Sequence, residues 1–207
     1  SSARNIGAIF DNRLSMSEHI ATIARGAWFQ LNQIGKIRSY LDTESTKTLV
    51  HSFVSSRLDS FNSLLYGVPD YDIKKLQRIQ NAAAKLITGL KKFDHVTPAL
   101  ISLHWLPVQS RIDFKILMLV YKALNGLAPQ YLCDLLQPRI HDKNTRNSDC
   151  VSLFIPKENN VKYGQKSFSY VAPLLWNRLP RDCKSAESLD IFKRRVKTFL
   201  FKSAFDL

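Results

Sequence analysis

The segment Asp70–Lys92, "DYDIKKLQRIQNAAAKLITGLKK", decides the fold class because its apolar and basic residues separate onto two sides of a helix. At 100° per residue, one side collects the apolar side chains Ile73, Leu76, Ile79, Ala83, Ile87 and Leu90. The opposite side collects, within about 40° of one another, the basic side chains Lys74, Arg78, Lys85 and Lys92. Asp70 or Asp72 is expected to cap the helix, and the two lysines beyond Gly89, at its C-terminal end, agree with the helix macrodipole. The sequence therefore predicts an amphipathic helix with one buried and one basic face.

Helical periodicity also precedes this segment. Ser15 and Glu18 have the spacing of a capping box, which predicts the start of a helix that runs to about Arg38. A second helix is expected at about 44–57, with Asp42 or Thr43 as its cap.

Further helices are expected after the central segment. One short helix is predicted at about 97–103, and another runs from Pro107 to about Leu124 before Gly126. Shorter helices are expected within 128–136 and 157–180. The last helix covers about 185–202, and its inward residues are predicted to be Leu189, Phe192, Val196, Phe199 and Leu200.

Extended structure is predicted at only two places. "NIGAIF" predicts a strand at about 4–10, and "VSLFIP" predicts a second strand at 151–156. The fold class is therefore mainly α, with a short N-terminal strand and a helical C-terminal region that contains a small β element. Polar, aperiodic residues predict an exposed loop at 137–150, which is followed by a basic region at 151–207.

The charge is strongly positive and unevenly distributed. Thirty Lys and Arg against 17 Asp and Glu give a net charge of +13, and the pI is near 9.8. The net charge rises from +2 over residues 1–69 to +4 over 70–136 and +7 over 137–207. Such a balance is typical of proteins that bind phosphates, in nucleic acids or on anionic membranes, although a basic surface without a partner has the same composition.

Two sets of basic residues repeat one spacing. Lys74, Arg78 and Lys85 stand at positions 0, +4 and +11 of their helix, and Arg111, Lys115 and Lys122 repeat this pattern on a helix that is otherwise almost entirely apolar. Such rows suit a phosphate backbone, or they form a solvated face. Because a nearly buried helix rarely keeps unpaired charge, Arg111 and Lys115 are expected to bind nucleic acid or to form salt bridges. A third group on the last helix consists of Lys193, Arg194, Arg195 and Lys197, which spread around the helix instead of forming a row. This group fits binding of template RNA, a nuclear-import patch or ordinary solvated charge, and Lys193, Arg194 and Lys197 are selected as candidate contacts.

Patterns of catalytic chemistry are missing. The five histidines lack metal-ligand spacing, there is no Cys-x-x-Cys, and no glycine-rich phosphate loop is present. Asp42/Glu44 and Asp70/Asp72 are close pairs that are better explained as helix caps. The three cysteines (Cys133, Cys150 and Cys183) suggest a reducing compartment. We therefore expect no catalytic and no metal-binding residue in this chain.

Several long motifs carry a resemblance. "LQRIQNAAAKLITGLKKFDHVTPAL" (76–100), "LHWLPVQSRIDFK" (103–115) and "YKALNGLAPQYLCDLL" (121–136) follow one another. With "YGQKSFSYVAPLLWNRLP" (163–180) and "FKRRVKTFLF" (192–201), they resemble the C-terminal part of a non-LTR, LINE-type retrotransposon reverse transcriptase. The jockey and chicken-repeat branch is the most similar, and the resemblance extends over nearly the whole chain.

The resemblance implies a role in an RNA-directed DNA polymerase. Residues 1–14 would be the end of the palm, 15–92 a thumb-like helical bundle, and 93–136 a helical post-thumb region. The family's Ala-Asp-Asp turn, which holds Mg²⁺, has no counterpart here because the chain contains no adjacent Asp-Asp pair. The chain, which begins without Met, is therefore expected to be a non-catalytic fragment that has no cofactor of its own. Its expected partners are template–primer RNA and DNA and an upstream palm, in the nucleus and cytoplasm and not at a membrane.

Two alternatives remain open. The 12 Phe, 7 Tyr and 3 Trp fit a helical protein-interaction module derived from a decayed or domesticated retroelement. Binding to an anionic membrane is disfavoured, because the basic helices have no dominant Trp/Phe face. Trp105, in "LHWLPV", and Trp176 are expected to be apolar anchors rather than base-stacking residues. His104 is expected to be a hydrogen-bonded structural residue rather than a ligand.

Overall fold

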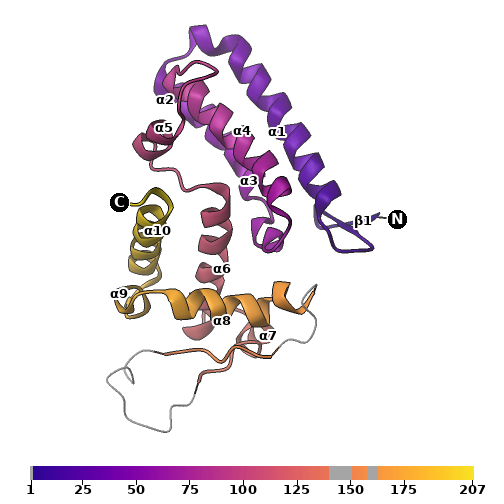
Figure 1. The fold of residues 1–207 in the computed structure, drawn as a ribbon, viewed down its shortest axis with the longest axis vertical. Helices are drawn as coiled ribbons and strands as arrows, with labels where there is room; N and C mark the ends of the chain where they lie inside the picture. Colours follow the sequence, from indigo (N-terminus) through magenta and orange to yellow (C-terminus); the bar gives the residue numbers. More distant parts are fainter. Residues whose placement is uncertain (1, 140–150, 158–162) are drawn as a thin grey trace. The chain divides into compact units, whose positions relative to one another are not determined.

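The computed structural model describes residues 2–139, 151–157 and 163–207, and it divides the chain into two compact units, Ser1–Ile112 and Asp113–Leu207 (Figure 1). The structure is mainly helical, with a short antiparallel sheet at its N-terminus, as predicted. The boundary between the units falls inside one helix, α6 (Val108–Leu124). Each unit has its own buried apolar residues and is described separately.

The first unit begins with a β-hairpin. β1 (Ser2–Asn5) pairs antiparallel with β2 (Ala8–Asp11), and Asn5 faces Ala8 across a two-residue turn. Both turn residues have positive φ, 48° at Ile6 and 96° at Gly7, as in the tight turns of hairpins. The prediction of one continuous strand at 4–10 is therefore wrong, because the chain reverses in the middle of the β-rich segment.

Asp11 forms the connection between the hairpin and the first helix, α1 (Ser17–Ile37). Its carboxylate accepts hydrogen bonds from the backbone N–H of Arg13 (2.9 Å), Ser15 (3.1 Å) and Met16 (3.0 Å), and from the Ser15 hydroxyl (2.9 Å). The predicted capping box of Ser15 and Glu18 does not form: Met16 occupies the N-cap position with a left-handed backbone, and no side chain of the described part of the chain caps the helix there. A carboxylate from the preceding strand organises this turn instead.

The second predicted helix is divided into three parts. After the 3-10 turn η1 (Arg38–Tyr40), α2 (Thr43–Val50) continues into a π-helical turn, η2 (His51–Ser55), and α3 (Ser56–Asp59). Asp42 caps α2 by accepting a 2.6 Å hydrogen bond from the Ser45 N–H, which confirms one of the two predicted caps. The 3-10 turn η3 (Asn62–Leu65) follows.

The central helix of this unit, α4 (Asp70–Thr88), has the predicted buried face. It packs against α1 and α2 (Figure 1). Its inward residues Leu76, Ile79, Ala83 and Ile87 are buried, whereas Ile73 and Leu90 are partly exposed.

Neither Asp70 nor Asp72 occupies the N-cap position of α4. Pro69 stands at the N-cap position, and Asp72 is fully buried, where it accepts hydrogen bonds from Ser17 Oγ (3.0 Å) and Lys75 Nζ (2.8 Å). The last turn is closed by Arg38, which donates to the carbonyls of Leu86 (3.0 Å) and Ile87 (3.3 Å). Gly89 ends the helix at φ 73°, so Leu90 and Lys92, which were predicted to lie on the helix, follow it. Asp72 therefore ties α4 to α1 instead of capping it.

A short helix, α5 (Thr97–Ser102), leads to the segment before α6. Trp105 is 8% exposed, which confirms that it is an apolar anchor, and Pro107 directly precedes the first residue of α6.

The second unit packs around Phe192. It contains the end of α6, the short helices α7 (Gln130–Cys133) and α9 (Arg181–Lys184), the 3-10 turn η4 (Gly164–Lys166), and the longer helices α8 (Phe168–Arg178) and α10 (Leu189–Phe205). The Phe192 ring is fully buried and stacks on Tyr121 of α6 at 4.3 Å between centroids. Trp176 of α8 lies 5.8 Å from the same ring and is 2% exposed, as expected of a structural tryptophan.

The predicted strand at 151–156 does not form. Leu153 makes one isolated antiparallel bridge with Pro138, and its N–H and carbonyl pair with the amide side chain of Asn177 at 2.9 and 2.8 Å. A helix side chain therefore satisfies the backbone groups that a partner strand would have used. Most of the loop predicted at 137–150 lies outside the described residues.

Candidate nucleic-acid interface

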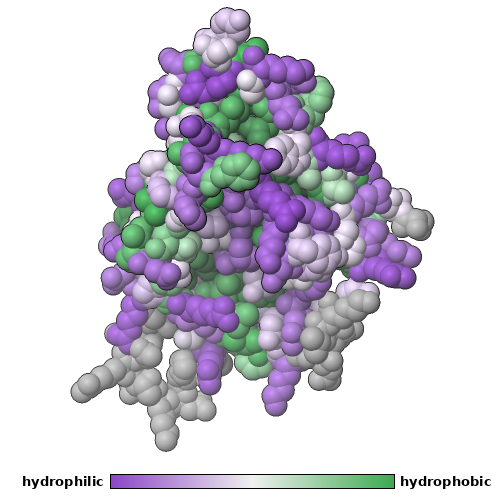
Figure 2. Space-filling view, turned by 45° about the horizontal axis from the view of Figure 1, so that its top comes forward, coloured by the Kyte–Doolittle hydropathy of each residue, from purple (hydrophilic) through white to green (hydrophobic). Residues whose placement is uncertain are grey.

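Hydrophilic residues cover much of the face drawn in Figure 2, and smaller hydrophobic areas lie between them. The candidate residues belong to both units. In the first unit they are on α4, in the turn after it and at the start of α6, and in the second unit they are on α6 and α10. Each group is therefore considered within its own unit.

The basic face of α4 is only partly free. Lys74 and Arg78 are exposed, and among the described residues neither has a carboxylate partner. Lys85 is half-buried, and its Nζ donates a 2.7 Å hydrogen bond to the carbonyl of Lys92. Lys85 thus holds the turn that follows the helix, whereas the other two cations point to solvent.

The turn after α4 presents another cation beside an exposed ring. Lys92 is exposed, and its Nζ lies 5.5 Å from the centroid of the Phe93 ring, which is 90% exposed. Asp94 fixes this turn because its carboxylate accepts a 2.7 Å hydrogen bond from the N–H of Lys91. The turn therefore places a cation and an aromatic surface next to each other, the two groups that bind a phosphate and a base.

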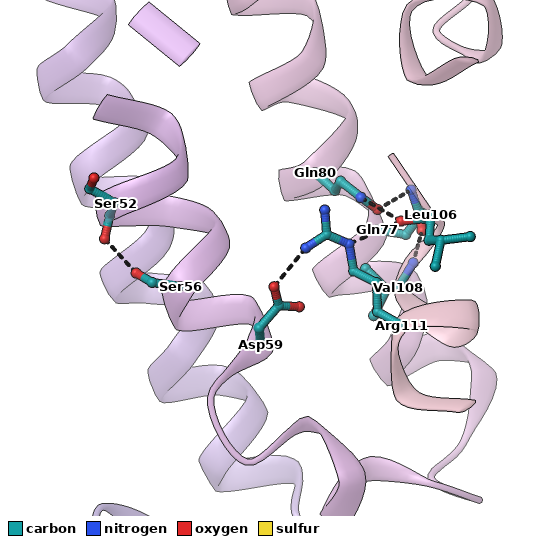
Figure 3. A network of polar contacts seen from close by, with 8 residues as sticks. All are labelled: Ser52, Ser56, Asp59, Gln77, Gln80, Leu106, Val108 and Arg111. Carbon is teal, nitrogen blue, oxygen red and sulfur yellow. Dashed lines mark hydrogen bonds and ion pairs between the residues drawn. The ribbon is translucent and has the colours of Figure 1, made fainter. Parts of the chain in front are cut away.

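Arg111 is a salt-bridged residue, the second of the two roles expected for it. Its Nη1 lies 2.8 Å from Asp59 Oδ2 of α3, and its Nε donates to the carbonyl of Leu106 at 3.0 Å (Figure 3). The guanidinium also lies 5.8 Å from the Trp105 ring centroid, and the side chain is only 17% exposed. Its charge is thus used inside the first unit.

Two glutamines of α4 complete this network. Gln80, which is 1% exposed, donates from Nε2 to the same Leu106 carbonyl at 2.8 Å, and Gln77 Oε1 accepts from the N–H of Val108 at 2.8 Å (Figure 3). The sequence contains no local sign of these contacts, because the partners are 26 and 31 residues apart. They fix the first turn of α6 against α4, and they explain why a cation and amides lie among apolar residues here.

The remaining cations of α6 belong to the second unit. Lys115 is exposed and Lys122 is half-buried, and neither has a carboxylate partner among the described residues. Arg111 is engaged in the first unit, so the repeated spacing does not produce a row of three free cations.

The candidates on α10 also differ from one another. Lys193 Nζ lies 3.1 Å from the exposed carboxylate of Asp190, one turn earlier. Arg194 and Lys197 are exposed and have no such partner within the described part of the chain. An exposed ion pair of this kind is weak, and therefore a phosphate can replace the partner of Lys193.

A groove on the second unit adds residues that the sequence-based selection omitted. Arg195 and Lys202 line this groove between α9 and α10, together with Arg194 and the ring of Phe199. The spacing of Arg195, Phe199 and Lys202 at i, i+4 and i+7 was a usable signal, because it places all three on one helix face.

Two further observations concern metals and membranes. Among the described residues, no group of three or more His, Cys, Asp or Glu side chains is arranged to hold a metal ion. None of the helices in the same part of the chain has the length and apolar character needed to cross a membrane.

Compared with known proteins, the chain matches no family model, no curated protein and no solved structure.

Proposed function

We propose that this chain is a nucleic-acid-binding module, the C-terminal part of a retrotransposon RNA-directed DNA polymerase, whose catalytic Asp-Asp site and Mg²⁺ belong to an upstream palm domain. It grips template–primer or element RNA in the nucleus or cytoplasm. The observation that carries the proposal is the outer face of α4, where Lys74 and Arg78 are exposed and unpaired within the described structure. The net charge of +13 and the motif resemblance support it.

The binding surface of the first unit consists of Lys74, Arg78 and Lys92, with Phe93 beside them. These cations interact with phosphates. Their binding releases counterions from the phosphate backbone of the nucleic acid, which favours association without recognition of the bases. Arg111 belongs to the internal network and not to this surface. In the second unit, Lys115, Lys122, Lys193, Arg194 and Lys197 are proposed as secondary phosphate contacts.

The experiment is fluorescence anisotropy of a labelled RNA with the full chain over a range of salt concentrations. Replacing Lys74 and Arg78 by Glu should weaken binding to all sequences alike, and should lower the slope of log K against log salt by about 1 per lost contact. Binding that does not respond to salt would contradict the proposal.

A matched control comes from α1. Arg25 and Lys36 are exposed residues of the same unit, outside the proposed surface, and their replacement by Glu changes the net charge by the same amount. If this control weakens binding as much as the α4 variant does, the effect is one of overall charge, and the α4 surface is excluded.

One observation favours a second function, a protein-interaction module. Phe29 of α1 is 60% exposed and Phe53 of the neighbouring η2 turn is 45% exposed. Exposed aromatic side chains on adjacent elements are typical of protein-binding surfaces. This function predicts that Phe29→Ser and Phe53→Ser abolish binding to a protein partner, while RNA binding is absent from the unmodified chain at low salt.

A further inference from the structure

An open groove lies between α9 and α10 in the second unit. Its volume is about 580 Å³, and its walls include Pro180, Ile191, Phe199, Arg194, Arg195 and Lys202. All of these residues are in α10 or directly beside α9, so the groove is formed within one unit. A concave surface of this size holds a small planar group better than a flat helix face does.

Part of the groove lining is apolar. Ile191, Phe199 and Pro180 contribute carbon surface, and Cys183, which is 3% exposed, also lines the groove. Burial raises the pKa of the Cys183 thiol, which keeps it protonated and neutral at physiological pH. An aromatic ring and aliphatic side chains are the surface on which a nucleobase stacks.

The groove lining is also rich in cations. Arg194, Arg195 and Lys202 line the groove, and Asp182 is the one acidic residue among its lining residues. Arg195 is held in place because its guanidinium donates to the backbone carbonyl of Asp182. Arg194 and Lys202 are exposed and, within the described residues, have no carboxylate partner. Two cations are therefore free to bind an anion in a groove that is also lined by apolar side chains.

We infer that this groove binds one nucleotide of single-stranded RNA, with the base against Phe199 and Ile191 and the flanking phosphates at Arg194 and Lys202. The inference rests on the proposed function and adds a preference for unpaired strands. A paired base is stacked inside its duplex and does not reach the Phe199 ring, whereas an unpaired base does. A stretch of Asp or Glu residues matches the cations but supplies no flat ring to stack on Phe199, whereas every RNA base does, so RNA is the better match.

The experiment measures the affinity of the full chain for a short labelled single strand and for the same strand annealed to its complement. Arg194→Glu with Lys202→Glu, and separately Phe199→Leu, should each weaken binding of the single strand about fivefold or more while duplex binding changes less. Phe199→Leu keeps the apolar volume and charge, and therefore reports on the aromatic ring alone.

Two controls match these changes. Lys157→Glu with Lys166→Glu reverses the same number of exposed charges in the second unit, away from the groove lining. Phe201→Leu removes a ring from α10 that packs on Phe205 and does not line the groove. Neither control should alter the ratio of single-strand to duplex affinity.

A 4-thiouridine in the single strand provides an independent readout. Photocrosslinking to the peptide that contains Phe199 supports the inference, and crosslinks confined to other peptides overturn it. Retained single-strand preference in the groove variants, together with loss of binding in the α4 variant, overturns the groove while the proposed function stands. Absence of RNA binding in the unmodified chain overturns both. Binding of polyglutamate that requires Arg194 and Lys202, while the single strand does not require them, identifies a peptide site and overturns the inference.

Discussion

Arg111 and Asp59 are 52 residues apart in the sequence and are joined by a 2.8 Å ion pair that connects the first turn of α6 to the end of α3. Asp59 is 44% exposed, so the ion pair alone contributes at most about 1 kcal/mol to stability. The less exposed Arg111 also donates to the Leu106 carbonyl and lies beside Trp105. Its main contribution is therefore to fix the start of α6, not to pair with a carboxylate.

Arg111→Met should destabilise the first unit by about 1–3 kcal/mol, because it removes a charge-assisted hydrogen bond and a packed guanidinium. Asp59→Asn should cost less, and the coupling energy from the double-mutant cycle should not exceed about 1 kcal/mol. Urea unfolding of the four proteins measures these values. RNA affinity in folded Arg111→Met should equal that of the unmodified chain, and a large loss would return Arg111 to the binding surface.

Asp11 predicts a stability change in acid. Hydrogen bonds from the backbone of Ser15, from its hydroxyl and from the backbone of Arg13 and Met16 lower the pKa of Asp11 from 3.8 to about 2. The stabilisation is therefore complete above pH 3.8 and is lost as the pH falls towards 2. Asp11→Asn should be less stable than the unmodified chain at neutral pH, and the difference should shrink over this range. Thermal unfolding at a series of pH values tests it, and a constant difference would contradict this role.

His19 predicts a second pH effect, which is caused by burial and not by hydrogen bonds as at Asp11. It is 3% exposed, its Nδ1 accepts from the N–H of Ile9 at 3.4 Å, and its Nε2 has no hydrogen-bond partner among the residues that the structure describes. Burial lowers the pKa of His19 below 6.5, so the unfolded chain binds a proton more readily than the folded chain. Stability from the neutral ring is complete above pH 6.5 and decreases as the pH falls below it.

His19→Leu should therefore reduce the loss of stability below pH 6.5, because the buried ring no longer has to be protonated on unfolding. The free energy of unfolding at several pH values between neutral and mildly acidic provides the measurement. The exposed His51 of the same unit is the control, because His51→Leu also removes one histidine but not a buried one. Equal effects of the two substitutions would show that burial of His19 is not the cause.

Phe192 predicts the stability of the second unit. Because it is fully buried between Tyr121 and Trp176, Phe192→Ala should cost about 3–5 kcal/mol. Urea unfolding followed by tryptophan fluorescence, to which Trp176 of this unit contributes, measures this loss. Phe154, which is 48% exposed in the same unit, is the control, and Phe154→Ala should change stability by less than about 0.5 kcal/mol.

The sequence was informative where one face of a helix is buried. On α4 the positions of Leu76, Ile79 and Ala83 specify the buried side because every third or fourth residue meets the same neighbours. For the same reason Lys74 and Arg78 were correctly expected on the outside. The assignment of these cations to RNA stays a prediction, since a solvated face has the same pattern.

Long-range partners and unusual backbone conformations were not predictable in this way. Nothing near Arg111 in the sequence identifies Asp59 as its partner, and nothing near Leu153 identifies Asn177. The hairpin was missed because Ile6, a β-branched residue, adopts a positive φ that such residues rarely have, although Gly7 beside it was a sign of a turn. The spacing of Ser15 and Glu18 predicted a capping box, but Ser15 instead donates hydrogen bonds to the carboxylate of Asp11.

The Ile6–Gly7 turn separates two properties that usually go together, solvent exposure and tolerance to substitution. Gly7 is exposed, yet its φ of 96° strains any other residue, and an added Cβ would lie 3.3 Å from the Phe61 ring. A saturation library would therefore record position 7 as intolerant, in the manner of a core residue, although water reaches it. In this hairpin, the turn requires a residue that has no Cβ at position 7.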